Sequence, residues 1–166
     1  MTRQSIEKIC VPRLVNALYA AYDVGGSHFL DNVDVCGITL KPEFQHRGLS
    51  YLLGLLNSNL LRWYFPFISA PFRGGWLSAN RQFLSQLPIR TIEFINPTEK
   101  ANHAHMVALV EQMLSLHKQL AESKLPQAKT VLQRQMEITD RQINQLVYEL
   151  YELTDEEIKI VEESVR

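Results

Sequence analysis

Apolar and polar residues follow two different periods along this chain. In the first forty residues the apolar positions form short alternating runs, which predict strands at residues 8–12, 28–30 and 33–40. Gly37 shifts the last alternation by one position, which is typical of a β-bulge. Residues 14–22 fit the spacing of a helix as well as that of a strand. The N-terminal part of the chain is therefore predicted to contain a small sheet.

A denser apolar pattern then predicts helix. Residues 49–64 place leucines on more than one face, so we expect one helix that is buried on two sides, with Ser50 as its N-cap. This helix is too short and too polar to span a membrane. Pro66 and Pro71 are expected to enclose an apolar connection at residues 67–70.

The stretch at residues 72–89 (FRGGWLSANRQFLSQLPI) joins two kinds of sequence. Its first part, residues 73–76, contains two glycines and is expected at the surface as a flexible turn. Its second part, residues 77–87, is predicted to be a short helix with Ser78 as its N-cap, ended by Pro88. The apolar side chains expected to be buried from this part are Phe83, Leu84, Leu87 and Ile89.

Heptad spacing dominates the chain after residues 96–98, which mark the best internal boundary. The apolar residues recur three and four positions apart in two seams, Met106, Leu109, Met113, Leu116 and Leu120, then Leu132, Met136, Thr139, Ile143, Leu146, Leu150 and Leu153. Pro126 separates the seams, so we predict an antiparallel helical hairpin packed seam to seam. A capping box of Thr154 and Glu157 predicts a short last helix.

These elements predict an α+β fold, with a small mixed α/β globule in residues 1–95 and the helical hairpin and last helix in residues 96–166. A length of 166 residues is enough for one domain with a buried core. Cys10 and Cys36 lie far apart, and this usage fits a reducing cytoplasm better than a disulfide framework. Because no secretory pattern or apolar span of membrane length is recognisable, we expect a cytoplasmic protein without a membrane anchor.

Charge is unevenly distributed, although the formal net charge is only -1. Residues 41–90 carry six basic and one acidic side chain, whereas residues 91–166 carry eight basic and thirteen acidic ones. The basic residues of the first segment are Lys41, Arg47, Arg62, Arg73, Arg81 and Arg90. Such a segment suits a polyanion, because Arg can bind phosphates or guanine edges with two hydrogen bonds. An ordinary solvated surface would have the same composition, so charge alone leaves both interpretations open.

No catalytic or metal-binding arrangement is recognisable in the sequence. His103 and His105 are two positions apart, and the two cysteines lack ligand spacing, so no metal site is predicted. The serines lack a nucleophile elbow, and the glycine pairs lack a nucleotide-binding pattern. The carboxylates of the C-terminal helices alternate with Lys and Arg, as on solvated faces. We therefore predict neither catalytic residues nor a cofactor.

Three stretches carry a resemblance to a known family. They are LLGLLNSN at residues 52–59, FRGGWLSANRQFLSQLPI at residues 72–89 and LVYELYELTDEEI at residues 146–158. Together they resemble the TaqI-like C-terminal specificity domain of type II and IIG restriction-modification enzymes, which is related to the type I specificity subunits. The resemblance covers roughly residues 8–158.

The resemblance implies a module that recognises a DNA sequence. It would bind double-stranded DNA for a methyltransferase and an endonuclease located elsewhere in the same system, since the motifs of both enzymes are missing here. Contacts to phosphates and groove edges are implied for His46, Arg47, Arg73, Trp76 and Arg81. A structural role is implied for Asn57, Asn80, Phe83, Leu87 and Pro88, with Asn80 as a helix cap or loop anchor.

An alternative function stays open. The heptad helices would also suit a protein-interaction or dimerisation module, which docks on a methyltransferase or on a second copy of the chain. In that case the basic residues would be incidental. A free-standing enzyme, by contrast, is not supported by any recognisable set of catalytic residues.

Overall fold

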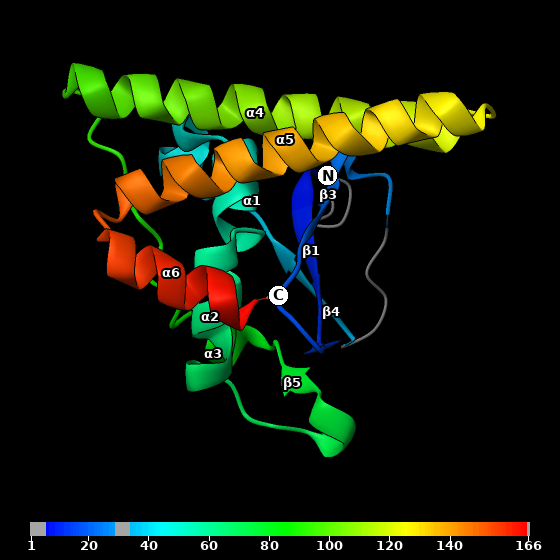
Figure 1. The fold of residues 1–166 in the computed structure, drawn as a ribbon. Helices are drawn as coiled ribbons and strands as arrows, with labels where there is room; N and C mark the ends of the chain where they lie inside the picture. Colours follow the sequence, from blue (N-terminus) through cyan, green and yellow to red (C-terminus); the bar gives the residue numbers. More distant parts are fainter. Residues whose placement is uncertain (1–5, 29–33, 166) are drawn as a thin grey trace.

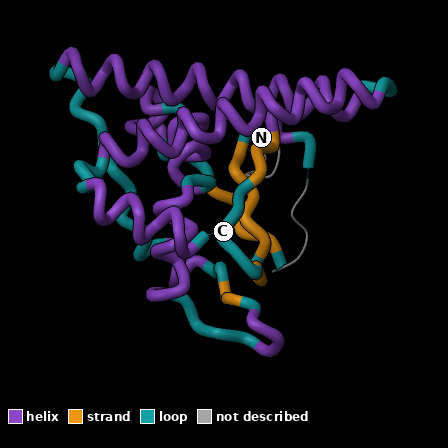
Figure 2. Tube along the Cα trace, viewed as in Figure 1, coloured by secondary structure: helices purple, strands orange, loops and turns teal. Residues whose placement is uncertain are grey.

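The computed structural model describes residues 6–28 and 34–165. Two long helices run antiparallel along one edge of the molecule, and a small sheet and shorter helices lie beneath them (Figure 1). Figure 2 shows the strands gathered on one side of the globule, with helices forming most of the rest. The predicted α+β class is confirmed.

A three-stranded antiparallel sheet in the order β3-β1-β4 forms the N-terminal part. It consists of β1 (Lys8–Pro12), β3 (Ala21–Asp23) and β4 (Val35–Ile38). The central strand β1 is the first strand that the sequence predicts, and it buries Ile9 and Val11 completely. Alternating β-branched residues fit a pleated strand with one buried face, so this strand follows from local sequence.

The bulge predicted at Gly37 is wrong. Gly37 pairs with Cys10 in an unbroken register, between the pairs that Cys36 and Ile38 form with their own partners. Gly37 therefore interrupts the alternation of apolar and polar side chains along β4. It does not interrupt the backbone pairing with β1. Of the strand predicted at residues 28–30, all but the first residue lies outside the described residues.

Residues 14–22, which fitted helix or strand, contain strand at both ends, and residues 16–20 between them form neither helix nor strand. Leu14–Val15 is strand β2, and Ala21 begins β3. β2 pairs with β5 (Leu77–Ser78) in a second, two-stranded antiparallel sheet. Because the partner of β2 lies far along the chain, local spacing could not decide between helix and strand.

The single helix predicted at residues 49–64 is two helices, α1 (Leu49–Leu56) and α2 (Asn59–Ile68). Ser58, which is fully buried, forms the break. Its hydroxyl donates to the carbonyl of Leu55 at 2.7 Å and accepts from a backbone amide of α2 at 3.3 Å. The N-cap expected at Ser50 is therefore wrong, because the side-chain cap stands at the start of α2.

The apolar connection expected between two prolines is also wrong in its limits. Pro66 lies inside α2, which continues to Ile68. Proline has no backbone N–H and disturbs a helix from within, and α2 ends within one turn of it. The connections elsewhere contain 3₁₀ turns, which are η1 (Val24–Gly26), η2 (Pro42–Arg47) and η3 (Arg73–Gly75).

The short helix predicted at residues 77–87 is reduced to one turn, α3 (Arg81–Leu84). Asn80 caps it, and its side-chain oxygen accepts from the amide of Gln82 at 2.9 Å. The cap role expected for Asn80 is confirmed, whereas the N-cap predicted at Ser78 is wrong. Ser78 is unavailable as a cap because it belongs to strand β5.

The C-terminal helices follow the prediction closely. Helix α4 (Pro97–Glu122) and helix α5 (Pro126–Leu150) pack antiparallel along their length, and α6 (Asp155–Ser164) follows. Thr154 and Glu157 form both hydrogen bonds of the predicted capping box. The heptad seams thus meet within one chain, since most of their residues are buried or half-buried.

One hydrophobic core joins the sheet, α1, α2 and the helical hairpin. Gly54 of α1 makes the close approach of α4 possible. A Cβ atom on Gly54 would lie 2.6 Å from the sulfur of Met106 and 3.0 Å from a methyl group of Val110. Most residues of the leucine-rich helix α1 are buried in this core, in agreement with the expectation of a helix buried on two sides.

Candidate nucleic-acid interface

A tight hairpin at residues 71–77, named the RGG hairpin here, carries two of the residues expected to contact DNA. It closes through a bridge between its first and last residues and through a 2.6 Å hydrogen bond from the amide of Phe72 to the carbonyl of Trp76. The turn has φ angles of 74° at Gly74 and 80° at Gly75. Glycine adopts these angles without strain, which explains the two glycines of the motif.

The RGG hairpin is attached to the globule on both sides. The hydroxyl of Ser69 donates to the carbonyl of Ser78 at 2.8 Å, and the amide of Ser78 donates to the carbonyl of Ala70 at 3.1 Å. Strand β5, which follows the hairpin directly, pairs with β2. The turn lies at the end of the molecule farthest from α4 and α5 (Figure 1), and both Arg73 and Trp76 are exposed there.

Arg81 lies close behind the RGG hairpin in sequence, at the first position of α3. Its side chain is exposed, whereas Phe83 and Leu84 of the same turn pack against the core. The cap residue Asn80 also donates to the hydroxyl of Ser78 at 3.2 Å, which ties α3 to β5. The geometry therefore keeps Arg81 on the same connected segment as Arg73 and Trp76.

His46 and Arg47 lie elsewhere, on η2 next to α4. The ring of His46 stands 5.2 Å from the ring of Phe94, edge to face. The ring nitrogen Nε2 of His103 donates to the carbonyl of Arg47 at 2.6 Å, and the Arg47 guanidinium lies 5.2 Å from the ring of Phe44. These two residues and the RGG hairpin are at opposite ends of the molecule (Figure 1), so the five candidates form two separate groups.

Part of the predicted basic segment is half-buried and contacts the rest of the fold. The Arg90 guanidinium pairs with Glu99 at 3.0 Å and donates to the carbonyl of Leu150 at 3.2 Å. Arg62 is half-buried and lines a cavity. Among the described residues, the exposed cations of this segment are Lys41, Arg73 and Arg81. Two of these three exposed cations, Arg73 and Arg81, lie in the RGG hairpin and α3. The exposed positive charge is therefore more concentrated there than the count of six basic residues in the segment suggests.

The residues expected to be structural have interior or connecting positions. The Asn57 side chain donates to the carbonyl of Ala20 at 3.0 Å and accepts from the amide of Ala20 at 2.8 Å, which ties α1 to the segment before β3. Leu87 is buried, and Phe83 packs against the core. The carbonyl of Pro88 accepts the hydroxyl hydrogen of Tyr151 at 2.6 Å. These contacts hold the segment after α3 on α5.

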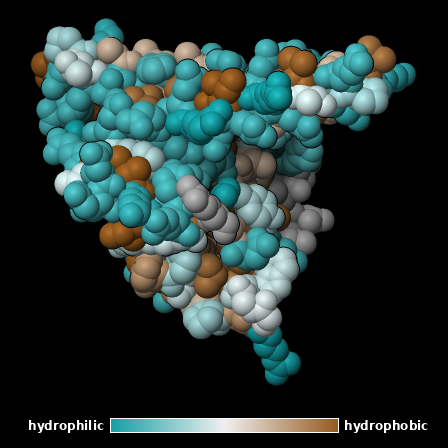
Figure 3. Space-filling model, in the orientation of Figure 1, coloured by the Kyte–Doolittle hydropathy of each residue, from teal (hydrophilic) through white to brown (hydrophobic). Residues whose placement is uncertain are grey.

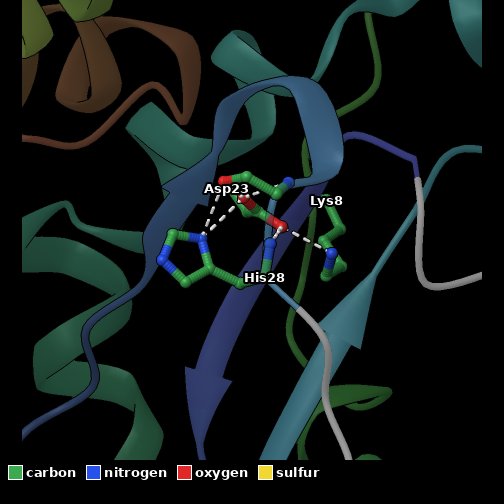
Figure 4. A network of polar contacts seen from close by, with 4 residues as sticks. Lys8, Asp23 and His28 are labelled. Carbon is green, nitrogen blue, oxygen red and sulfur yellow. Dashed lines mark hydrogen bonds and ion pairs between the residues drawn. The ribbon is translucent and has the colours of Figure 1, made fainter.

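A buried polar network fixes the turn after β3 (Figure 4). The Lys8 ammonium lies 2.5 Å from one carboxylate oxygen of Asp23, and both side chains are 3 % exposed. The backbone amide of His28 and its ring nitrogen Nδ1 also contact Asp23, at 3.1 and 2.9 Å. The Lys8 hydrogen bond, followed by that of His28, holds the pKa of Asp23 well below its usual range.

This network does not have the geometry of a nucleophilic triad, although it contains Ser27, His28 and Asp23. The Ser27 hydroxyl, at 3.1 Å, and the Asp23 carboxylate both contact the same ring nitrogen, Nδ1 of His28. In a working triad the serine and the carboxylate use different nitrogens of the ring, so that the base can accept the serine proton. We interpret the cluster as a structural cap of the turn.

A cavity of about 590 Å³ lies between α1, α4, α5 and the segment before β3. Apolar side chains such as Leu53 and Val110 form much of its wall, and Arg62 and Asp140 also line it. Partial burial raises the pKa of Asp140, and the nearby Arg62 guanidinium counteracts this effect. Of the five residues expected to contact DNA and the five expected to be structural, Asn57 alone lines this cavity. The cavity is therefore separate from the RGG hairpin.

Within residues 6–28 and 34–165, no three His, Cys, Asp or Glu side chains come together as metal ligands. In the same part of the chain, no helix combines the length and apolar composition needed to cross a bilayer. The surface on the face seen in Figure 3 is mostly hydrophilic over the long helices, and hydrophobic and near-neutral side chains gather toward the opposite end. Exposed apolar surface at that end is typical of an interaction site.

Comparison with known families identifies the class of protein. Residues 2–89, more than half of the chain, match the family model of a specificity domain. The chain belongs to the family of the TaqI-like C-terminal specificity domain. This match includes the RGG hairpin and α3, and it confirms the family that the sequence resembles. The third stretch of the resemblance, residues 146–158, lies outside the matched residues.

A relative with a known name shows where such a domain occurs. The chain is 28% identical over 124 residues to the type II restriction enzyme and methyltransferase RM.Eco57I of Escherichia coli. The similar region covers 74% of this chain and 12% of that protein. The chain thus spans only a small part of the length of this relative. The relative's name includes both a restriction enzyme and a methyltransferase.

Proposed function

We propose that this chain is the DNA-sequence-recognition module of a restriction-modification system. It binds double-stranded DNA and positions it for a methyltransferase and an endonuclease that lie elsewhere in the same system. Methyl transfer and DNA cleavage are therefore assigned to those partners, and the module itself supplies binding and specificity. This proposal rests on the family and on the geometry of the RGG hairpin.

The main observation in support of the proposal is that Arg73 and Trp76 are exposed on a turn that backbone hydrogen bonds hold in place. A hairpin held by backbone hydrogen bonds presents its end residues in a defined orientation, which reduces the entropy lost on binding. An exposed Arg can bind a phosphate or a guanine edge, and a bidentate contact to guanine contributes roughly 1 to 3 kcal/mol of discrimination. Arg81 follows on the same segment as a second cation.

The test is a selection from random-sequence duplexes, followed by binding measurements on the recovered duplexes at several salt concentrations. We expect the chain to enrich a defined sequence, alone or together with the methyltransferase of its system. Arg73→Ala should weaken binding and reduce the slope of log affinity against log salt by about one, because one phosphate contact is lost. Fluorescence anisotropy between about 50 and 200 mM salt covers the informative range.

Arg134→Ala is the matched control, since Arg134 is an exposed arginine on α5, away from the RGG hairpin. This control should leave the affinity and the salt slope nearly unchanged. Equal losses in the two variants would contradict a specific role of the hairpin. Failure to bind any duplex, even at the lowest salt and with the methyltransferase present, would contradict the proposed function itself.

A second candidate function, protein association through the helices, is supported by one observation. Most seam residues are used inside the chain, and Leu146 and Leu150 are 4 and 6% exposed. Val131 and Ile138 of α5, one heptad apart, are instead 56 and 49% exposed. A contact with another protein or a second copy would therefore use this outer face of α5.

A further inference from the structure

Three large aromatic side chains are exposed between residues 67 and 76, at the end of α2 and in the RGG hairpin. Phe67 is 70% exposed, Phe72 57% and Trp76 44%. Aromatic side chains favour burial, so several exposed rings in one segment indicate a surface that another molecule covers. Neither Phe67 nor Phe72 was among the residues expected to contact DNA, because Phe67 fell in the apolar connection expected at residues 67–70 and Phe72 at the start of the stretch at residues 72–89.

Phe72 and Trp76 occupy opposite positions of the hairpin. The 2.6 Å hydrogen bond from the Phe72 amide to the Trp76 carbonyl joins their backbones directly. Residues opposite each other in an antiparallel pair project their side chains from the same face. The two rings therefore flank the turn from one side, with Arg73 between them in sequence.

The rings are also supported from below. A Cβ atom on Gly74 would lie 3.6 Å from Cδ1 of the Trp76 indole, so the indole lies beside the backbone of the turn. Phe67 is held by Trp63, whose ring centroid lies 5.2 Å away, edge to face. Rings that are held in place lose little freedom on binding, which favours insertion into a partner.

Charge favours a polyanion as the partner. Between Phe44 and Ile92 the sequence contains no Asp or Glu, and Arg73 and Arg81 of this segment are exposed. A segment that combines aromatic rings and arginines without carboxylates matches stacked bases framed by phosphates. A protein partner would not require the complete lack of carboxylates in this segment.

We propose that Phe72 and Trp76 form an aromatic wedge that inserts at a base step of duplex DNA, while Arg73 contacts an adjacent phosphate. This inference rests on the proposed function and deepens it. Inserted apolar side chains partly unstack a step and bend the duplex, and flexible pyrimidine–purine steps deform most easily. The wedge thus reads the deformability of a step in addition to any base edge.

The experiment uses the duplex recovered from the random-sequence pool, with 2-aminopurine at one position at a time and dyes at both ends. The native chain should raise the 2-aminopurine fluorescence at one step and bring the duplex ends closer. Phe72→Ala and Trp76→Ala should lose both signals and bind about tenfold more weakly, because a stacked ring is lost. Trp76→Phe keeps a ring and should retain both signals.

Two further variants separate the wedge from other roles. Tyr19→Ala removes an aromatic ring with the same 44% exposure as Trp76 and should change neither signal. Arg73→Ala should weaken binding and lower the salt slope but keep the 2-aminopurine signal at saturation. Because the altered rings are exposed, thermal melting should show intact folding in each variant.

The inference is overturned if the native chain binds the recovered duplex without a fluorescence change at any position. It is also overturned if Phe72→Ala and Trp76→Ala keep native affinity and both signals, as would happen if the rings contacted a protein instead. In either case DNA binding itself is still observed, so the proposed function stands. The lack of any duplex binding contradicts both.

Discussion

At the scale of single residues, Asp23 is the most tightly held side chain of the N-terminal globule. It accepts hydrogen bonds from Lys8, Ser27 and His28 (Figure 4). These donors favour the ionised carboxylate and keep the pKa of Asp23 well below the ordinary value of 3.8. The turn between β3 and the following segment therefore depends on this carboxylate being charged.

The pH dependence of stability follows from the direction of this shift. A carboxyl group with a lowered native pKa stabilises the fold above its unfolded pKa, and the contribution is lost as the pH falls toward the native pKa. We expect the free energy of unfolding to decrease as the pH falls below about 4. Asp23→Asn should lower stability at neutral pH and flatten this part of the profile in urea unfolding experiments.

Glu163→Gln provides the control, because the Glu163 side chain is 62% exposed and its partner Lys159 lies at 3.9 Å. Surface pairs of this kind contribute little, so this variant should keep the native profile. An Asp23→Asn profile that runs parallel to the native one at all pH values would show that the network is not coupled to folding.

Residue identity alone did not reveal which arginines face solvent. Arg90 and Arg73 look alike in the basic segment, yet the Arg90 side chain is half-buried and bonds to Leu150 and Glu99. The partners of Arg90 lie on α4 and at the end of α5, so its role depends on how the helices dock. Arg73 could be predicted as exposed because two glycines follow it, and they specify a turn locally.

At the scale of elements, the break between α1 and α2 is a local feature that the leucine pattern conceals. Leucines continue at helical spacing through the break, so periodicity alone predicts one helix. Ser58 ends this continuity by capping α2 and bonding to the last turn of α1. The sequence pattern favoured Ser50 as the only cap of this stretch, because Ser58 stands within the apparently continuous helix.

Substitution of the two serines tests this interpretation. Ser58→Ala should destabilise the chain by about 1 to 2 kcal/mol, because α2 loses its cap and a buried carbonyl of α1 loses a donor. Ser50→Ala, at the position first expected to be the cap, should stay within about 0.5 kcal/mol of the native value. Chemical denaturation followed by circular dichroism gives both values, and equal effects would argue against a special role of Ser58.

At the scale of the whole molecule, the second candidate function predicts contacts between copies of the chain through the outer face of α5. We expect concentration-dependent self-association, which the double substitution Val131→Lys with Ile138→Lys should abolish without lowering the melting temperature. The reason is that both side chains are exposed, so lysines there add repulsion between copies but remove little from the core. Sedimentation equilibrium over a range of concentrations measures the association.

Glu137→Lys is the matched control, because it changes the net charge by the same amount at a neighbouring exposed position of α5. It should leave the association intact if apolar contacts on the outer face are responsible. A native chain that stays monomeric at every concentration would exclude this dimer, and association that survives the double substitution would place the contact elsewhere.

The whole molecule also explains why the candidate interface was only partly predictable. His46 and Arg47 lie beside α4, whereas the RGG hairpin with Arg73 and Trp76 lies at the end of the molecule farthest from α4. The local sequence pattern does not indicate that these two groups are separated. Phe72 was missed for a related reason. Its position opposite Trp76 is set by the closure of the RGG hairpin, which the glycine turn allowed but did not by itself specify.

The sequence by itself determined the central strand β1, the helical hairpin, the capping box of α6 and the exposure of the RGG turn. These features depend on residues a few positions apart, and spacing and turn chemistry report such interactions directly. Only the tertiary structure decided the pairing of β2 with β5, the contacts of Arg90 with α4 and the end of α5, and the position of Phe72 opposite Trp76. Their partners come together only when distant segments dock, so their positions follow from packing and not from local pattern.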